Sequence, residues 1–84
     1  MSLLHRCISC FDKTNGGLAK EIPLINVQLA RLQELLGEPA DDLMYEMYRL
    51  SHRQASLLQE YANEPIDLDT YDCFLDCYVK ENDD

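Results

Sequence analysis

The chain has 84 residues and a formal net charge of −9 at pH 7, with 16 acidic residues against 7 lysines and arginines. This length allows a single small domain, so we treat residues 1–84 as one unit with a modest core. The negative charge argues against direct binding to nucleic acid or anionic lipid, because phosphate contacts need clustered Lys and Arg. No apolar run approaches the roughly 20 residues that span a bilayer, and the first residues lack a secretory signal. We therefore expect a cytoplasmic protein without membrane contact.

The first 21 residues allow two interpretations. Apolar residues recur there at helical spacing, which favours a short helix and a glycine-containing loop over 1–21. Asn15-Gly16 is also a strong tight-turn signal, and it would join a strand at 6–11 to a strand at 18–22. Of the two, we favour the short helix.

Two apolar stripes dominate the middle of the chain. Their spacings of three and four residues predict helices over about 22–36 and 39–63. Gly37 suits the left-handed position after a helix, and Pro39 suits the first turn of the next helix. A link this short predicts an antiparallel helical hairpin. The stripes consist of Ile22, Ile25, Leu29, Leu32 and Leu36, and of Leu43, Met47, Leu50, Leu57 and Tyr61.

A third apolar pattern, which includes Leu68 and Tyr78, predicts a C-terminal helix over about 67–80. Residues 80–84 have the composition of a frayed acidic tail. Burial of the two stripes does not offset the entropy lost in ordering the hairpin, so the hairpin needs a third element, a second copy or a partner. The predicted fold class is therefore a small all-α domain of three to four helices.

The candidate binding residues are acids and tyrosines. Asp69, Asp72 and Asp76 have spacings of three and four, which would place them on one face of the C-terminal helix. A row of acids can imitate a phosphate backbone toward the basic groove of a protein partner. Tyrosine is enriched at binding hot spots, so we take three tyrosines as apolar anchors. These are Tyr45, Tyr48 and Tyr71.

Four cysteines form two closely spaced pairs, Cys7 with Cys10 and Cys73 with Cys77. Four thiolates can hold a structural zinc, but the second spacing differs from that of a zinc knuckle. Two disulfides are a further alternative and need an oxidising compartment. Reduced cysteines that pack as small apolar residues are the interpretation that we favour. We therefore expect no cofactor, with zinc at these four residues as the alternative.

One further pattern consists of Ile25 and Leu29 in the first predicted helix, and of Leu50-Ser51 and Leu57-Leu58-x-x-Tyr61 in the second. It resembles the sporulation-type aspartyl-phosphate phosphatases, small two-helix proteins that dephosphorylate response regulators. The resemblance covers residues 25–61 and implies a helical hairpin. The family's signature acid would fall on Ala55, and its neighbouring glutamine on His52, so we do not transfer the activity.

The sequence has no catalytic signature, so we expect a non-enzymatic protein. The leading hypothesis is a small acidic regulator, inhibitor or adaptor, of a kind that phages and mobile elements encode, which binds a basic protein partner. The rival hypothesis is self-assembly, in which hairpins bury their stripes against copies of themselves as a homodimer or larger oligomer. A zinc- or thiol-dependent protein and a divergent phosphatase-like regulator are further alternatives.

Overall fold

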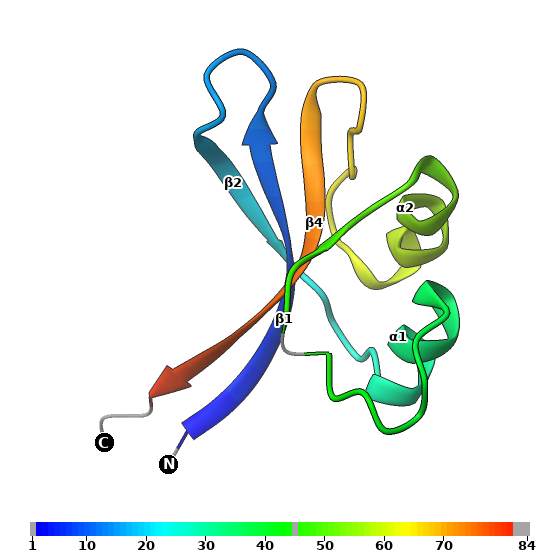
Figure 1. Cartoon of the computed structure of the whole chain (residues 1–84). Coiled ribbons are helices and arrows are strands. Elements are labelled where there is room, and N and C mark those ends of the chain that lie inside the picture. The colour runs from blue at the N-terminus through cyan, green and yellow to red at the C-terminus, as the bar shows by residue number, and fades with distance from the viewer. Residues whose placement is uncertain (1, 45, 82–84) are drawn as a thin grey trace.

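The computed structural model describes residues 2–44 and 46–81, and the side chains of 5–44 and 46–77 within them. It contains a four-stranded antiparallel sheet with the strand order β2-β1-β4-β3 (Figure 1). The strands are β1 (Ser2–Asp12), β2 (Leu18–Pro23), β3 (Tyr48–Arg49) and β4 (Tyr71–Glu81). The helices are α1 (Leu29–Leu36), α2 (His52–Leu58) and the 3-10 turn η1 (Gln59–Tyr61). In the described part of the chain, no helix is long and apolar enough to cross a membrane.

The all-α prediction is wrong at both ends of the chain. Residues that we assigned to a helix over 67–80 belong largely to β4, which pairs with β1 along the full length of both strands. Cys73 and Leu75 are buried in the core, and Phe74 between them faces the other side of the sheet. This alternation has the period of two that defines a strand.

The start of the chain follows the interpretation that we did not favour. β1 and β2 form an antiparallel hairpin, and Asp12 N–H donates to the Gly17 carbonyl at 2.8 Å to close its turn. Gly16 lies in this turn with a φ of 73°, a conformation that favours glycine. The Asn15-Gly16 signal therefore marked a hairpin, and no helix forms at residues 2–21.

The predicted helical hairpin is wrong as well. Within 22–36 only α1 is helical, and among the described residues of 39–63 only α2 and η1 are. The second helix starts late because the Ser51 hydroxyl accepts a hydrogen bond from Gln54 N–H, and the Gln54 side-chain oxygen accepts one from Ser51 N–H. This capping box fixes the helix start at residue 52.

The core lies between the two helices and one face of the sheet. The sheet contributes Ile8 and Ile22, while Leu32 of α1 and Leu58 of α2 cover them from the helical layer. Figure 1 shows both helices on the same side of the sheet. Alternate residues of the strands therefore point to a second face, which no described helix covers.

Candidate functional site

The second face of the sheet carries an apolar groove, which we call the outer groove. Phe11 of β1 and Phe74 of β4 form an edge-to-face aromatic pair with ring centroids 5.5 Å apart. Met47, just before β3, completes the groove and is 46% exposed. The groove has a volume of about 400 Å³, and its remaining lining residues are Gly16 and Asp72. Aromatic and methionine side chains of this kind are enriched at protein interfaces.

Two carboxylates flank Ser9 of β1 on the same face of the sheet. Asp76 of β4 accepts a hydrogen bond from the Ser9 hydroxyl at 3.1 Å, and Glu21 of β2 lies opposite Ser9 in the ladder. Burial, together with the negative charges of Glu21 and Asp76, raises the pKa of the neighbouring Cys7 thiol to about 11. The potential at this part of the sheet is therefore negative.

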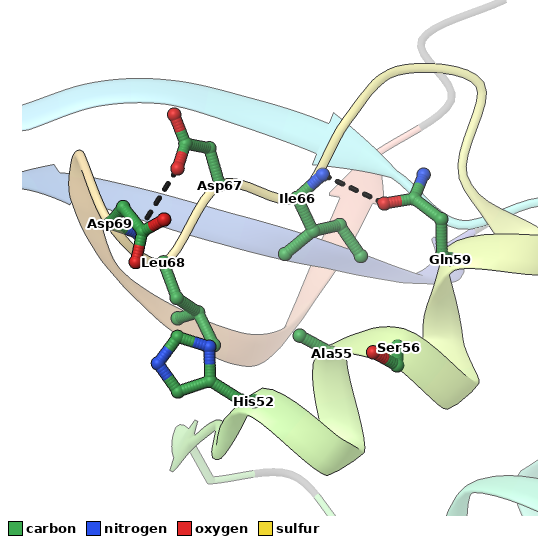
Figure 2. A pocket seen from close by; sticks show the side chains of 8 residues that line it. All are labelled: His52, Ala55, Ser56, Gln59, Ile66, Asp67, Leu68 and Asp69. Atoms are coloured by element: carbon green, nitrogen blue, oxygen red, sulfur yellow. Dashed lines mark hydrogen bonds between the residues drawn. The ribbon is translucent and has the colours of Figure 1, made fainter.

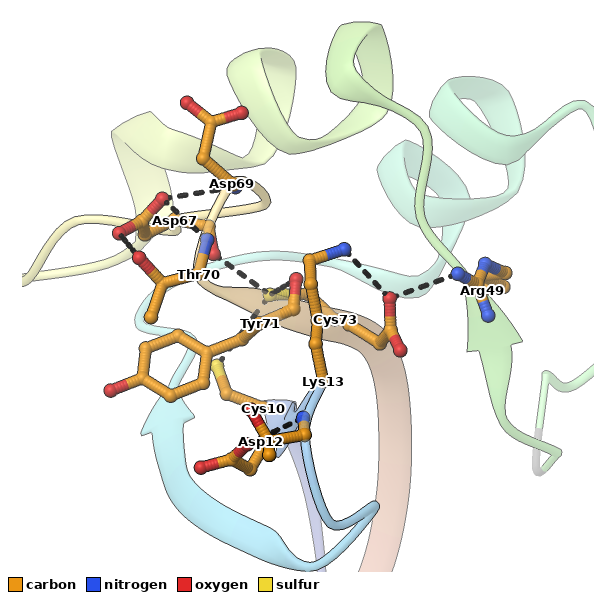
Figure 3. A network of polar contacts seen from close by, with 11 residues as sticks. Cys10, Asp12, Lys13, Arg49, Asp67, Asp69, Thr70, Tyr71 and Cys73 are labelled. Atoms are coloured by element: carbon orange, nitrogen blue, oxygen red, sulfur yellow. Dashed lines mark hydrogen bonds and ion pairs between the residues drawn. The ribbon is translucent and has the colours of Figure 1, made fainter.

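Asp72 connects the outer groove to a small charged network at the edge of the sheet (Figure 3). Its Oδ1 atom accepts from Lys13 Nζ and from Arg49 Nη2, each at 3.0 Å. Lys13, with a smaller contribution from Arg49, holds the pKa of Asp72 below its usual range. The Arg49 guanidinium also lies 5.7 Å from the centroid of the Phe74 ring. Asp72 therefore holds these two cationic side chains in position, and its own negative charge is paired with theirs.

A second group of acids lies in the loop between α1 and β3. The Met44 amide and the Tyr48 hydroxyl, which donates at 3.0 Å, lower the pKa of Asp42. Desolvation and the nearby Asp42 carboxyl raise the pKa of Glu38, and the charge of Glu46 adds to this effect. Crowding of like charges is unfavourable in the free protein, and a basic partner would relieve it.

A pocket of about 330 Å³ lies between α2 and the segment that leads into β4 (Figure 2). His52 and Ser56 of α2 line one side, and Asp67 and Asp69 line the other. Asp67 is engaged in its own turn, because it accepts from Asp69 N–H, Thr70 N–H and the Thr70 hydroxyl. Figure 2 shows no hydrogen bond between Ser56 and His52.

The described members of the predicted binding set do not all lie on one surface. Asp72 and Asp76 lie in β4, whereas Asp69 is exposed in the preceding turn, so the three do not form a helical face. Tyr48 and Tyr71 are half-buried against the core. Burial and the hydrogen bond to Asp42 raise the pKa of Tyr48 to about 12. Tyr45 falls outside the described residues.

The four cysteines do not converge on one point. Cys10 and Cys73 are buried on the helix-covered face, whereas Cys7 lies on the opposite face of β1. Cys77 is half-buried, and its sulfur accepts from the Arg6 guanidinium. In the described part of the chain, no three His, Cys, Asp or Glu residues are arranged to hold a metal ion.

Sequence reasoning missed the apolar part of the surface. Phe11 and Phe74 were read as helix residues, and Met47 as part of a core stripe. The available signal was the alternation in residues 72–76, where the buried Cys73 and Leu75 alternate with residues of the other face.

One protein family matches this sequence. Its model, described as a domain of unknown function (DUF7683), matches residues 5–76, which is most of the chain. The chain belongs to this family. The matched range contains both aromatic residues of the outer groove and the two carboxylates beside it. No curated protein matches the sequence, and the likeness of residues 25–61 to two-helix phosphatases fails because that range does not form a helical hairpin.

We expect the stability of the protein to fall in acid. The lowered pKa values of Asp42, Asp67 and Asp72 add stability above the unfolded value of 3.8, and this stability is lost as the pH falls through the folded values. Glu38, whose pKa is raised, acts in the opposite sense and favours folding as it becomes protonated. Thermal unfolding from pH 7 downward should therefore show a shallow maximum in mild acid and then a steep loss. Asp72→Asn should reduce that loss, because it removes one of the carboxyl groups whose pKa is lowered in the folded state.

Proposed function

We propose that this protein is a non-enzymatic protein-binding module, a small regulator, inhibitor or adaptor, that presents its outer groove to a basic protein partner. The observation that supports the proposal is the open groove of Phe11, Phe74 and Met47 in a strongly acidic protein. An apolar side chain of the partner fills the groove, and lysines or arginines around it meet the carboxylates.

The apolar groove and the carboxylates contribute differently to partner binding. The apolar groove supplies affinity, because its hydration water is released when a partner side chain enters. Glu21 and Asp76 supply selectivity, because they make no ion pair with a described lysine or arginine and thus keep a net negative charge. The net charge of −9 disfavours a second copy as the occupant, since two acidic chains repel each other.

The test is affinity capture from a nuclease-treated lysate of the native host, at low and moderate salt, with two matched variants. Met47→Lys places a positive charge in the outer groove. Leu57→Lys makes the same change at a residue of α2 with a similar exposure, 38% against 46%. We expect the native chain and Leu57→Lys to recover the same basic protein, and Met47→Lys to reduce its recovery by about tenfold or more.

Two results would contradict the proposal. One is recovery of a partner whose binding is lost in Leu57→Lys and retained in Met47→Lys. This result would show that the interface lies on the helical layer. The other is a partner that is not basic, or whose capture does not weaken as salt is raised, because charge complementarity would then play no part.

A further inference from the structure

Cys10 and Cys73 lie directly opposite each other in the two central strands, and both are almost fully buried. Their sulfur atoms are 3.7 Å apart, and Figure 3 shows the two side chains meeting between the strands. The residues are 63 positions apart in the chain, so only the fold brings them together.

The backbone geometry at this pair suits a covalent bond. Leu50 N–H donates to the Cys73 carbonyl at 2.9 Å, so the backbone groups of Cys73 point toward β3 and away from β1. Cys10 and Cys73 therefore form a non-hydrogen-bonded pair, in which the Cα atoms are about 4.5 Å apart and the side chains are closest. That separation lies at the short end of the range that disulfides span.

We propose that Cys10 and Cys73 are a redox-sensitive pair that forms a cross-strand disulfide with low-molecular-weight disulfides such as oxidised glutathione as the oxidant. One thiolate attacks the glutathione disulfide and releases one glutathione thiolate, and the second cysteine then displaces the other glutathione. The two protein thiols lose two electrons and two protons, and one glutathione disulfide becomes two reduced glutathione molecules.

The surroundings of the pair set its kinetics. Burial raises the pKa of Cys10 to about 12 and also raises that of Cys73, so few thiolates exist in the folded protein at neutral pH. The thiolate is the attacking species, so we expect slow oxidation of the folded chain that accelerates with pH. This protects the pair from brief exposure to oxidant and makes it respond to a sustained change.

The bond would act directly behind the outer groove. Phe11 follows Cys10, and Phe74 follows Cys73, on the opposite face of the same two strands. A disulfide would fix the spacing of β1 and β4 beneath the aromatic pair. This link to partner binding rests on the proposed function, whereas formation of the disulfide does not.

The test uses the full chain in buffer with oxidised glutathione at mildly alkaline pH, until the intact mass stops changing. Cys7→Ser/Cys77→Ser retains the proposed pair, and Cys10→Ser/Cys73→Ser removes it. We expect the first variant to lose two hydrogen atoms, to yield a linked peptide of Cys10 and Cys73, and to unfold about 10–20 °C higher because the bond closes a long loop. Dithiothreitol should reverse each change.

A parallel sample, denatured in reducing agent and refolded in the same glutathione buffer, should reach the same linked species. Peptide mapping of the native chain provides the same answer if Cys10→Ser/Cys73→Ser does not fold. Only mixed glutathione disulfides, a Cys7–Cys77 bond or an intermolecular bond in both samples would overturn the proposal. None of these measurements involves a partner, so their failure would leave the proposed binding function standing.

Discussion

Replacing Leu58 with alanine should lower the free energy of unfolding by about 2–5 kcal/mol. Leu58 is the last residue of α2, is fully buried and packs in the core with Leu32 and the sheet. Removing its terminal carbons leaves a cavity in the core. α2 is too short to bend into this cavity, and the core residues around Leu58 are held in place by the sheet.

The measurement is urea unfolding followed by circular dichroism, with Leu57→Ala as the control. Leu57 is the preceding residue of the same helix and is 38% exposed, so its truncation should cost much less. Native proteins have about 5–15 kcal/mol of stability in total, and an 84-residue chain lies toward the low end. Equal losses in the two variants would contradict the packing of α2 described above.

Local signals predicted some features of this fold correctly. The first helix ends at Leu36, and Gly37 follows with a φ of 71°, as the glycine predicted. The Asn15-Gly16 turn forms, although within the alternative that we had set aside. Both signals depend on the backbone preference of one or two residues, which acts in the same way in any fold.

The central sheet was not predicted because its main pairing is not local. β1 and β4 come from the two ends of the chain and meet along eleven pairs of residues. β1 shows no clear polar and apolar alternation, because the small residues Ser9 and Cys7 are buried on the helix-free face as well. A strand that is buried on both faces has the apolar density of a helix, and its periodicity alone does not separate the two.

Two of the predicted acids lie on one face although the predicted fold is wrong. Asp72 and Asp76 are four residues apart, a spacing that places side chains on one side of either a helix or a strand. They therefore share a face in β4 as well. Asp69 is three residues before Asp72, a spacing that places two side chains on one face only in a helix. In the structure Asp69 lies in the preceding turn, apart from the other two acids. Of the three predicted tyrosines, Tyr48 and Tyr71 are partly buried against the core.

Replacing Gln33 with alanine should destabilise the protein by about 1–3 kcal/mol, the cost of removing a buried polar side chain and leaving its partners unsatisfied. Gln33 lies in α1 and is almost fully buried. Its Nε2 atom donates to the carbonyl oxygens of Ala40 and Asp42, at 3.1 Å and 2.7 Å. One amide group thus ties the loop after α1 back onto the helix.

The position of this loop determines more than its own stability. It places the buried Met44 in the core and leads directly to Met47 in the outer groove. We therefore expect Gln33→Ala to weaken partner capture in addition to lowering the unfolding midpoint, although the residue lies on the opposite layer from the groove. Leu58→Ala should lower stability without a specific loss of capture, when both are measured well below their unfolding temperatures.

The variant Gln33→Met, combined with hydrogen exchange, distinguishes the contribution of Gln33 packing from that of its hydrogen bonds. Methionine retains the length of the side chain and lacks the two donors, so Gln33→Met should be destabilised almost as much as Gln33→Ala. The Met44 amide, which donates to Asp42 Oδ1 at 2.9 Å, should exchange faster in both variants than in the native chain. If Gln33→Met were as stable as the native chain and its Met44 amide equally protected, packing alone would hold the loop. The Gln33 hydrogen bonds would then not be what connects α1 to the outer groove.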